Sequence, residues 1–238
     1  MSVFQQERCL YCHRVIAPAV GWVALFSKEK EQPLCPTCEE RLEKVEGETC
    51  RICSRPFHRL GEQYRNGDLC HDCTRWEADP EWQGFLEKNH SLYLYNDFLK
   101  ELIATYKFRG DYILAKVFIE LFKKEVSEMA PDLLVPIPLS EERLYERGFN
   151  QSTAVLTYAG FPAAEILTRV HSEKQSKKSR EERIQIPQVF KMKHNGYIKD
   201  KRILLVDDIY TTGSTLRHAA KLLKEAGAES IQSLTIAR

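Results

Sequence analysis

The sequence of 238 residues lacks several features that would place it in a specialised class of protein. Its amino terminus contains no apolar segment of the kind found in signal peptides. Its most apolar stretch, residues 15–26, is too short to span a bilayer and contains Pro18 and Gly21. A formal net charge of +1 gives no global field that would attract nucleic acid, so such binding would depend on local patches. We therefore expect a cytoplasmic protein without a membrane span.

Two further absences concern motifs. No glycine is followed by lysine, so the chain lacks the G-x-x-x-x-G-K-[ST] loop of P-loop NTPases. No cysteine occurs after residue 73, although eight occur before it. Hydrophobic residues make up 43% of the chain and charged residues 29%, which is typical of a globular protein with a real core.

The eight cysteines form four C-x-x-C pairs, and two such pairs can complete a tetrahedral Cys₄ site. The pairs are Cys9/Cys12, Cys35/Cys38, Cys50/Cys53 and Cys70/Cys73. A reducing cytosol would not sustain four disulfides, which favours metal binding over oxidation. The third and fourth pairs enclose residues 54–69, within the usual zinc-ribbon spacing, and the first two enclose a slightly longer segment. We predict two structural zinc ions, because four protein ligands leave no position for water or substrate.

The spacing leaves the pairing open. Sequential pairing makes two ribbons in tandem, whereas a cross-braced arrangement joins the first pair to the third and the second to the fourth. Three histidines are close enough to be alternative ligands, but are expected at the surface: His13, His58 and His71. A basic cluster within the second ribbon permits phosphate contacts, or is simply a solvated face. It consists of Arg51, Arg55, His58, Arg59 and Arg65.

The clearest pattern lies near the carboxyl end of the chain. Residues 203–206 form a short apolar run that predicts a buried parallel strand, and Asp207 and Asp208 stand at its carboxyl end. A small polar loop follows, and then apolar residues at helical spacing as far as Gly227. Ligands of open α/β sheets bind outside the carboxyl ends of the strands, so this unit is a candidate binding site.

The loop between the strand and the helix has the chemistry of an anion site. A helix that opens after a loop offers unpaired N–H groups and a positive dipole end. Gly213 allows the backbone to approach a phosphate, and neighbouring hydroxyls add donors, from Thr211, Thr212, Ser214 and Thr215. The acidic pair suits neighbouring sugar hydroxyls, so a phosphorylated ribose is the simplest ligand. An ordinary core strand with an acidic turn is the alternative.

The remaining elements are those of an α/β domain. Residues 91–95 predict an edge strand, and two helices with apolar residues at 98–106 and 114–122 are expected to cover the sheet. Residues 132–138 predict a strand ended by stiff prolines, followed by a helix that ends near Gly160. Further strands are expected at 165–170, around Phe190 and at 230–236. The cations Lys107 and Arg109 are expected to be exposed at a helix end rather than to face a ligand.

The motif VDDIYTTGST at residues 206–215 resembles the 5-phosphoribosyl-1-pyrophosphate (PRPP) motif of type I phosphoribosyltransferases. The resemblance implies a mostly parallel sheet flanked by helices, with Asp207 and Asp208 on ribose hydroxyls and the loop on the 5′-phosphate. It also implies that the segment from Pro136 to Ser140 meets pyrophosphate and Mg²⁺. Arg147 is a candidate for a pyrophosphate contact, with local pairing to Glu141 or Glu142 as the alternative.

The polar stretch at 171–183 has the composition of a mobile loop, and members of this enzyme family carry a flexible lid at this place. Its cations are suited to a leaving pyrophosphate or a nucleic-acid backbone. They are Lys174, Lys177, Lys178, Arg180 and Arg183. Because three glutamates dilute this charge, a solvated loop is also a fair interpretation.

The whole chain resembles the ComF/GntX family, through the cysteine pairs together with VPIPLS, ERGFNQS, KQSKKSREER and ILLVDDIYTTGSTL. The resemblance implies a double zinc ribbon, here residues 1–78, followed by a phosphoribosyltransferase-like domain, here residues 90–238. It implies a role in DNA uptake during natural transformation, on single-stranded DNA, with partners such as a ComFA-like helicase. No segment has the character of a base-recognition hood, so the fold and the PRPP site can persist without ordinary nucleotide synthesis. The sequence assigns no catalytic residue. The alternative function is an active phosphoribosyltransferase on an unidentified base or nucleotide acceptor.

Overall fold

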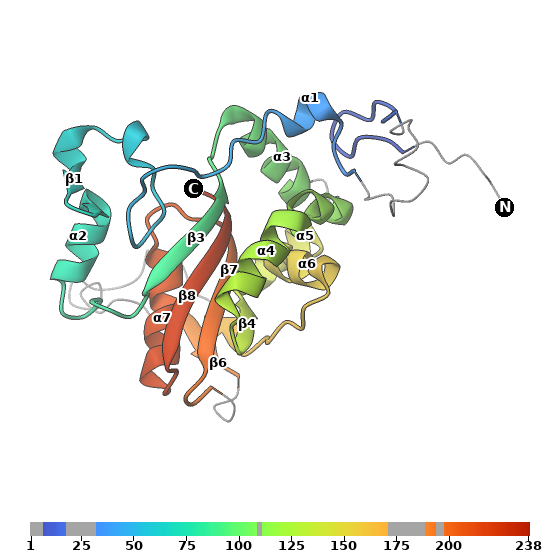
Figure 1. Cartoon of the computed structure of the whole chain (residues 1–238). Coiled ribbons are helices and arrows are strands. Elements are labelled where there is room, and N and C mark those ends of the chain that lie inside the picture. Colours follow the sequence, from blue (N-terminus) through green and yellow to red (C-terminus); the bar gives the residue numbers. More distant parts are fainter. Residues whose placement is uncertain (1–6, 18–31, 109–110, 171–188, 194–197) are drawn as a thin grey trace, which may run out of the picture.

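The centre of the protein is a four-stranded sheet in the order β3-β8-β7-β4, in which every neighbouring pair is parallel (Figure 1). Its strands are β3 (Lys88–Tyr93), β4 (Leu133–Pro136), β7 (Arg202–Ile209) and β8 (Ser230–Ala237). The structure is a computed structural model that describes residues 7–17, 32–108, 111–170, 189–193 and 198–238. It confirms the predicted α/β class and the parallel sheet.

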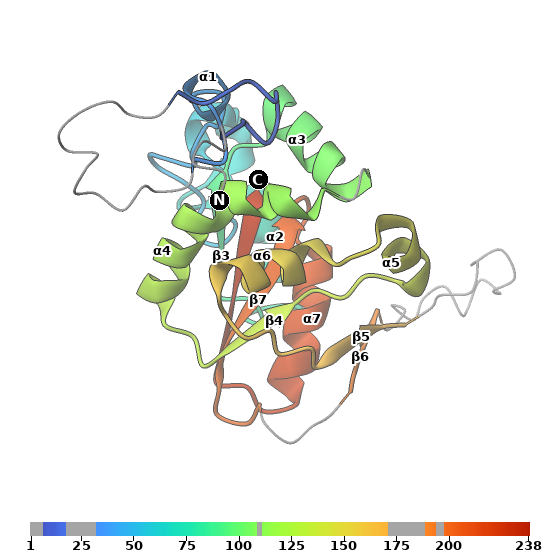
Figure 2. The same cartoon turned by 90° about the vertical axis from the view of Figure 1, so that its right-hand side faces the viewer.

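Helices cover both faces of this sheet. One face is covered by α3 (Asp97–Phe108), the 3₁₀ helix η3 (Tyr112–Phe118), α4 (Ile119–Met129) and α6 (Gln151–Ala159). The other face packs against α7 (Ser214–Glu225). The helices α4 and α6 of the first face and α7 of the second can be followed in Figure 2. Residues of β7 alternate between the two cores: Leu204 and Val206 pack in the first, Ile203 and Leu205 in the second. A strand buried on both faces explains the continuous apolar run in the sequence.

Shorter elements complete the fold. The helix α5 (Glu141–Arg147) follows β4, and β5 (Leu167–Arg169) pairs antiparallel with β6 (Phe190–Met192). The cysteine-rich part contains α1 (Pro36–Glu39), η1 (Phe57–Arg59), η2 (Glu62–Tyr64), β1 (Arg65–Asn66), β2 (Leu69–Cys70) and α2 (His71–Ala78). The predicted lid at 171–183 lies outside the described residues. Of the helices that are described, none is long and apolar enough to cross a membrane.

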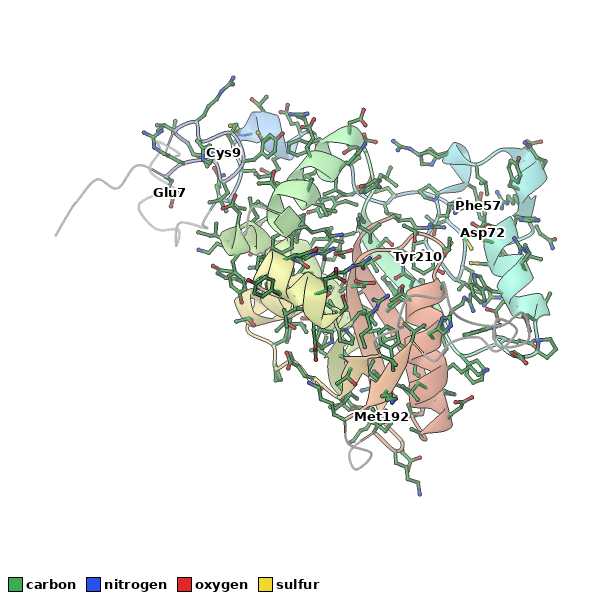
Figure 3. All side chains as sticks on the ribbon, turned by 180° about the vertical axis from the view of Figure 1, so that it is seen from behind. Glu7, Cys9, Phe57, Asp72, Met192 and Tyr210 are labelled. Atoms are coloured by element: carbon green, nitrogen blue, oxygen red, sulfur yellow. The ribbon has the colours of Figure 1, made fainter. Side chains whose placement is uncertain are left out.

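The two halves of the cysteine-rich part lie on different sides of the molecule. In Figure 3, Cys9 of the first half lies on one side, and Phe57 and Asp72 of the second lie on the other. The first half packs on α3, where the Tyr11 and Phe98 rings are 4.9 Å apart between centroids and the Arg41 guanidinium lies over Phe98. The second half joins the core on the face covered by α7. Each half therefore belongs to a different hydrophobic core, and the domain boundaries at residues 78 and 90 stay a prediction.

Backbone hydrogen bonds attach this part to the strand β3. Along its outer edge, the Val45 N–H donates to the Leu92 carbonyl at 3.1 Å, and the Leu94 N–H donates to the Glu43 carbonyl at 2.7 Å. The fully buried Asn89 donates its N–H to the Ile52 carbonyl at 2.6 Å, so β3 also holds the segment between Cys50 and Cys53. An edge strand covered in this way does not present free N–H and C=O groups along that stretch.

Candidate functional site

The predicted strand, acidic pair, loop and helix are all present. Asp207 and Asp208 are near the end of β7, and the residues that follow lead directly into α7. Gly213 has a φ of +81°, and a Cβ placed on it would lie 2.1 Å from the Tyr210 Oη. Only glycine fits there, because a side chain would be both strained in the left-handed region and in collision with the tyrosine. We call residues 211–215 the candidate phosphate loop.

The neighbouring strand brings a second loop to the same edge of the sheet. Pro136 is in register with Val206, and the Ile137 N–H donates to the Val206 carbonyl at 2.9 Å. The segment from Pro136 to Ser140 therefore begins beside Asp207. The Ser140 Oγ accepts from the Arg143 N–H at 3.3 Å as the N-cap of α5, so this oxygen orders the start of the helix.

Lys107 corrects the expectation from the sequence. Its Nζ lies 2.7 Å from the Asp208 Oδ2, and the two side chains are only 13% and 15% exposed. The prediction of an exposed cation was wrong, because α3 ends above the carboxyl end of β7 rather than in solvent. No local pattern could have shown this, since the contact joins residues about a hundred positions apart. At this low exposure, removal of the lysine would leave a poorly solvated carboxylate.

Asp207 differs electrostatically from its neighbour. It is half-buried, and its Oδ1 accepts from the Asp208 N–H at 2.9 Å. Burial first, and then the nearby Asp208 charge, raise the pKa of Asp207 to about 7, while Lys107 and Arg169 act in the opposite direction. The acidic pair therefore holds a carboxyl group that can gain or lose a proton near neutral pH.

The other cations predicted on the pyrophosphate side are only partly placed. Arg147 donates from Nη1 to the Gln151 Oε1 at 2.9 Å, across the turn between α5 and α6. Its contact with pyrophosphate stays a prediction. Lys174, Lys177 and Lys178 lie outside the described residues, so their role is a prediction too.

The cysteines form two Cys₄ centres with sequential pairing. The first comprises Cys9, Cys12, Cys35 and Cys38, and the second comprises Cys50, Cys53, Cys70 and Cys73. Within each centre the Sγ atoms all lie within 4.8 Å of one another, with Cys12 and Cys35 at 3.6 Å and Cys53 and Cys70 at 3.5 Å. Four sulfurs about 2.3 Å from one ion would be about 3.8 Å apart, so both centres fit zinc. The cross-braced alternative does not occur.

The basic cluster of the second ribbon is neutralised locally. Arg51 lies 2.6 Å from Asp68, Arg55 lies 2.8 Å from Asp72, Arg65 lies 2.5 Å from Glu48, and Arg59 pairs with Glu43. A cation that already has a carboxylate partner attracts a phosphate backbone less strongly. The structure therefore favours the interpretation of this cluster as a solvated face.

Two contacts with the candidate phosphate loop have no counterpart in the sequence analysis. The Trp76 Nε1 donates to the Thr212 carbonyl at 3.0 Å, and the Arg238 Nη1 donates to the Thr211 carbonyl at 2.8 Å. Neither residue belongs to a motif that the sequence analysis identified. The second Cys₄ centre therefore adjoins the candidate site.

Comparisons with known proteins show which sequences this chain is similar to. The phosphoribosyl transferase domain family matches residues 147–238. Competence protein ComFC of Bacillus subtilis is 38% identical over 236 residues, which cover 97% of this chain and 94% of that protein. Competence protein ComFC of Streptococcus pneumoniae is 31% identical, covering 97% and 100% respectively. DNA utilization protein YhgH of Escherichia coli K12 is 26% identical, covering 86% of this chain and 96% of that protein.

Zinc stoichiometry tests the pairing. We expect two zinc ions per chain by elemental analysis. The double substitution Cys12→Ser/Cys35→Ser removes ligands from the first centre alone, so one zinc should remain. The matched Cys12→Ser/Cys53→Ser removes one ligand from each centre and should lose both. Cross-braced pairing would give the reverse result.

The raised pKa of Asp207 predicts a specific dependence of stability on pH. A raised folded-state pKa contributes stability that is present at low pH and is lost as pH rises through about 7. Between pH 6 and pH 8, the wild type should therefore lose about 1–2 kcal/mol relative to Asp207→Asn. Urea unfolding of both proteins at the two pH values measures this difference. A constant difference would show that Asp207 is ionised throughout this range.

Proposed function

We propose that this chain, which belongs to the ComF/GntX family with the ComFC proteins, is a competence protein. In this proposal it handles incoming DNA and binds PRPP. The observation that supports the ligand most directly is the acidic pair beside a glycine-containing loop at a helix N-terminus, at the carboxyl end of a parallel strand. A cytoplasmic location and a ComFA-like helicase partner are parts of the same proposal. The names of the relatives support the role in DNA handling.

Each part of the site has a distinct task in this proposal. The N–H groups and hydroxyls of residues 211–215, with the positive end of α7, bind the 5′-phosphate. Asp207 and Asp208 accept hydrogen bonds from the ribose hydroxyls. Mg²⁺ would neutralise the pyrophosphate beside the segment from Pro136 to Ser140. Lys107 adds a positive charge beside Asp208, and their ion pair orients that carboxylate.

The same site suits phosphoribosyl transfer, which is the alternative function. A nucleophile on an acceptor would form a bond to C1 of the ribose while the bond from C1 to the pyrophosphate oxygen breaks. The positive charge that develops on the sugar and the negative charge on the pyrophosphate would both be stabilised electrostatically. Release of pyrophosphate in the presence of an acceptor would identify this activity.

A surface for single-stranded DNA is proposed on α5 and its surroundings. Tyr145 is 91% exposed, which is unusual for an aromatic side chain and suits stacking on a nucleic-acid base. Arg143 on the same helix is exposed. The burial of Arg169 first, and then the Arg143 charge, lower the pKa of Arg169, whose charge also acts on Asp207. The cations therefore extend from α5 toward the acidic pair. This surface replaces the ion-paired arginines of the second ribbon as the candidate DNA contact.

Calorimetric titration with magnesium-PRPP tests the ligand. We expect saturable binding by the wild type and at least a hundredfold loss in Asp207→Asn/Asp208→Asn, since two hydrogen-bond acceptors to the ribose lose their charge. Asp132→Asn is the matched control, because Asp132 pairs with Arg202 at the opposite end of the strands. Absence of binding to folded, zinc-loaded wild type would contradict the proposal.

Fluorescence anisotropy with a single-stranded oligonucleotide tests the DNA surface. Tyr145→Ala should weaken binding about tenfold, within the range for loss of one stacked base. The matched control is Tyr64→Ala, a tyrosine 51% exposed on the second ribbon, which should have little effect. Affinity should fall steeply as salt rises, because phosphate contacts release counterions. Equal effects of the two substitutions, or binding independent of salt, would argue against this surface.

A further inference from the structure

The Arg238 guanidinium connects the second Cys₄ centre to the candidate phosphate loop. Its Nη2 donates to the Cys53 Sγ at 3.0 Å, and its Nη1 donates to the Thr211 carbonyl at 2.8 Å and the Tyr210 carbonyl at 3.3 Å. The guanidinium also lies over the Tyr210 ring, 4.7 Å from its centroid. A single planar cation thus contacts a metal ligand and the backbone of the loop at the same time.

A second connection comes from α2, the helix that carries the ligand Cys73. Three residues further along, the Trp76 Nε1 donates to the Thr212 carbonyl at 3.0 Å. The fully buried Arg217 of α7 pairs with Glu77 of α2 at 2.8 Å, and its guanidinium lies 5.1 Å from the centre of the Trp76 ring. The position of α2 relative to the loop and α7 is therefore set by the hydrogen bonds of Trp76 and Glu77.

These contacts determine which way the loop presents its N–H groups. The carbonyls of Tyr210, Thr211 and Thr212 are held by Arg238 and Trp76, and every peptide bond in the described residues is trans. In a trans peptide the N–H points opposite to the carbonyl of the same unit. The N–H groups of Thr211, Thr212 and Gly213 therefore point away from Trp76 and Arg238, whose side chains donate to the carbonyls. That is the orientation in which they can donate to an anion.

The charge of the second Cys₄ centre links it to the candidate phosphate loop through Arg238. A zinc ion with four thiolates carries a net charge of about −2, which nearby cations must offset. Arg238 supplies such a cation directly, because its Nη2 donates to the Cys53 Sγ at 3.0 Å. Without metal, no ion would hold the four sulfurs together, and the guanidinium would lose the fixed partner that positions it beside the loop.

We propose that the second Cys₄ centre is an integral part of the phosphate site, with Arg238 as the positioning residue: zinc at this centre and a sugar phosphate at residues 211–215 strengthen each other's binding. This inference rests on the proposed function, because it requires the loop to bind a phosphate. The first Cys₄ centre packs on α3 and has no comparable contact with the loop among the described residues. It therefore serves as an internal control in the same chain.

The experiment follows zinc release from the full-length, zinc-loaded protein in excess chelator, with and without ribose 5-phosphate. Alkylation of the freed cysteines, followed by peptide mass spectrometry, shows which centre has opened. Saturating ribose 5-phosphate should slow opening of the second centre about tenfold and leave the first unchanged, since linkage requires the two effects to be reciprocal. Equal protection of both centres, or protection of neither, would overturn the coupling. If ribose 5-phosphate still bound in calorimetry, the proposed function would remain intact.

Arg238→Met keeps the aliphatic stem and removes the three donated bonds. It should retain two zinc ions but lose the ligand-dependent protection, and its affinity for ribose 5-phosphate should fall about tenfold. Arg202→Met, at the other end of β7 and 48% exposed, is the matched control and should behave as wild type. If Arg238→Met does not fold, Trp76→Phe removes one donor only and should reduce the protection. If the variant that folds still shows full protection, the role assigned to the contacts is refuted. If the wild type binds no sugar phosphate at all, the proposed function and the coupling are both refuted.

Discussion

The parallel sheet must be covered on both of its faces, and the rest of the structure depends on this constraint. Four helical segments cover one face, but α7 is the main helix on the other, where the second cysteine-rich module completes the core. Apolar side chains on an uncovered face would remain in water, at a cost of about 25 cal/mol for each Å². Each half of the cysteine-rich part thus packs into the hydrophobic core on one face of the sheet, and this explains why the two halves lie on different sides.

The same packing creates the environment of the candidate site. Because α3 ends above the carboxyl end of β7, Lys107 reaches Asp208 in a place with little water. Because Asp207 stands in the same partly buried position with less direct pairing, its pKa rises toward neutrality. Two adjacent carboxylates therefore have different surroundings, although the sequence presents them as equivalent: Asp208 pairs with Lys107, and Asp207 accepts the Asp208 N–H.

Local patterns predicted a large part of this protein. The C-x-x-C spacing was enough to predict two Cys₄ centres, because ligands two residues apart meet on one ion whatever the surrounding fold. The apolar run, the acidic pair and Gly213 were enough to predict the strand, loop and helix, because each depends on residues within a few positions of one another. Lys107 was assigned wrongly, and Trp76 and Arg238 were not assigned to the site. Their partners lie far away in the sequence, where periodicity carries no information.

The sequence by itself determined the secondary structure around the loop, the inventory of metal ligands and the parallel character of the sheet, since these follow from short-range spacing and side-chain chemistry. Only the tertiary structure decided which cysteine pairs share a centre, because sequential and cross-braced pairing use the same residues. It also decided that the arginines of the second ribbon are ion-paired and that Arg238 joins a metal ligand to the loop. The physical reason is that such contacts depend on how β7, β8 and α2 pack together, and packing is a property of the whole folded chain.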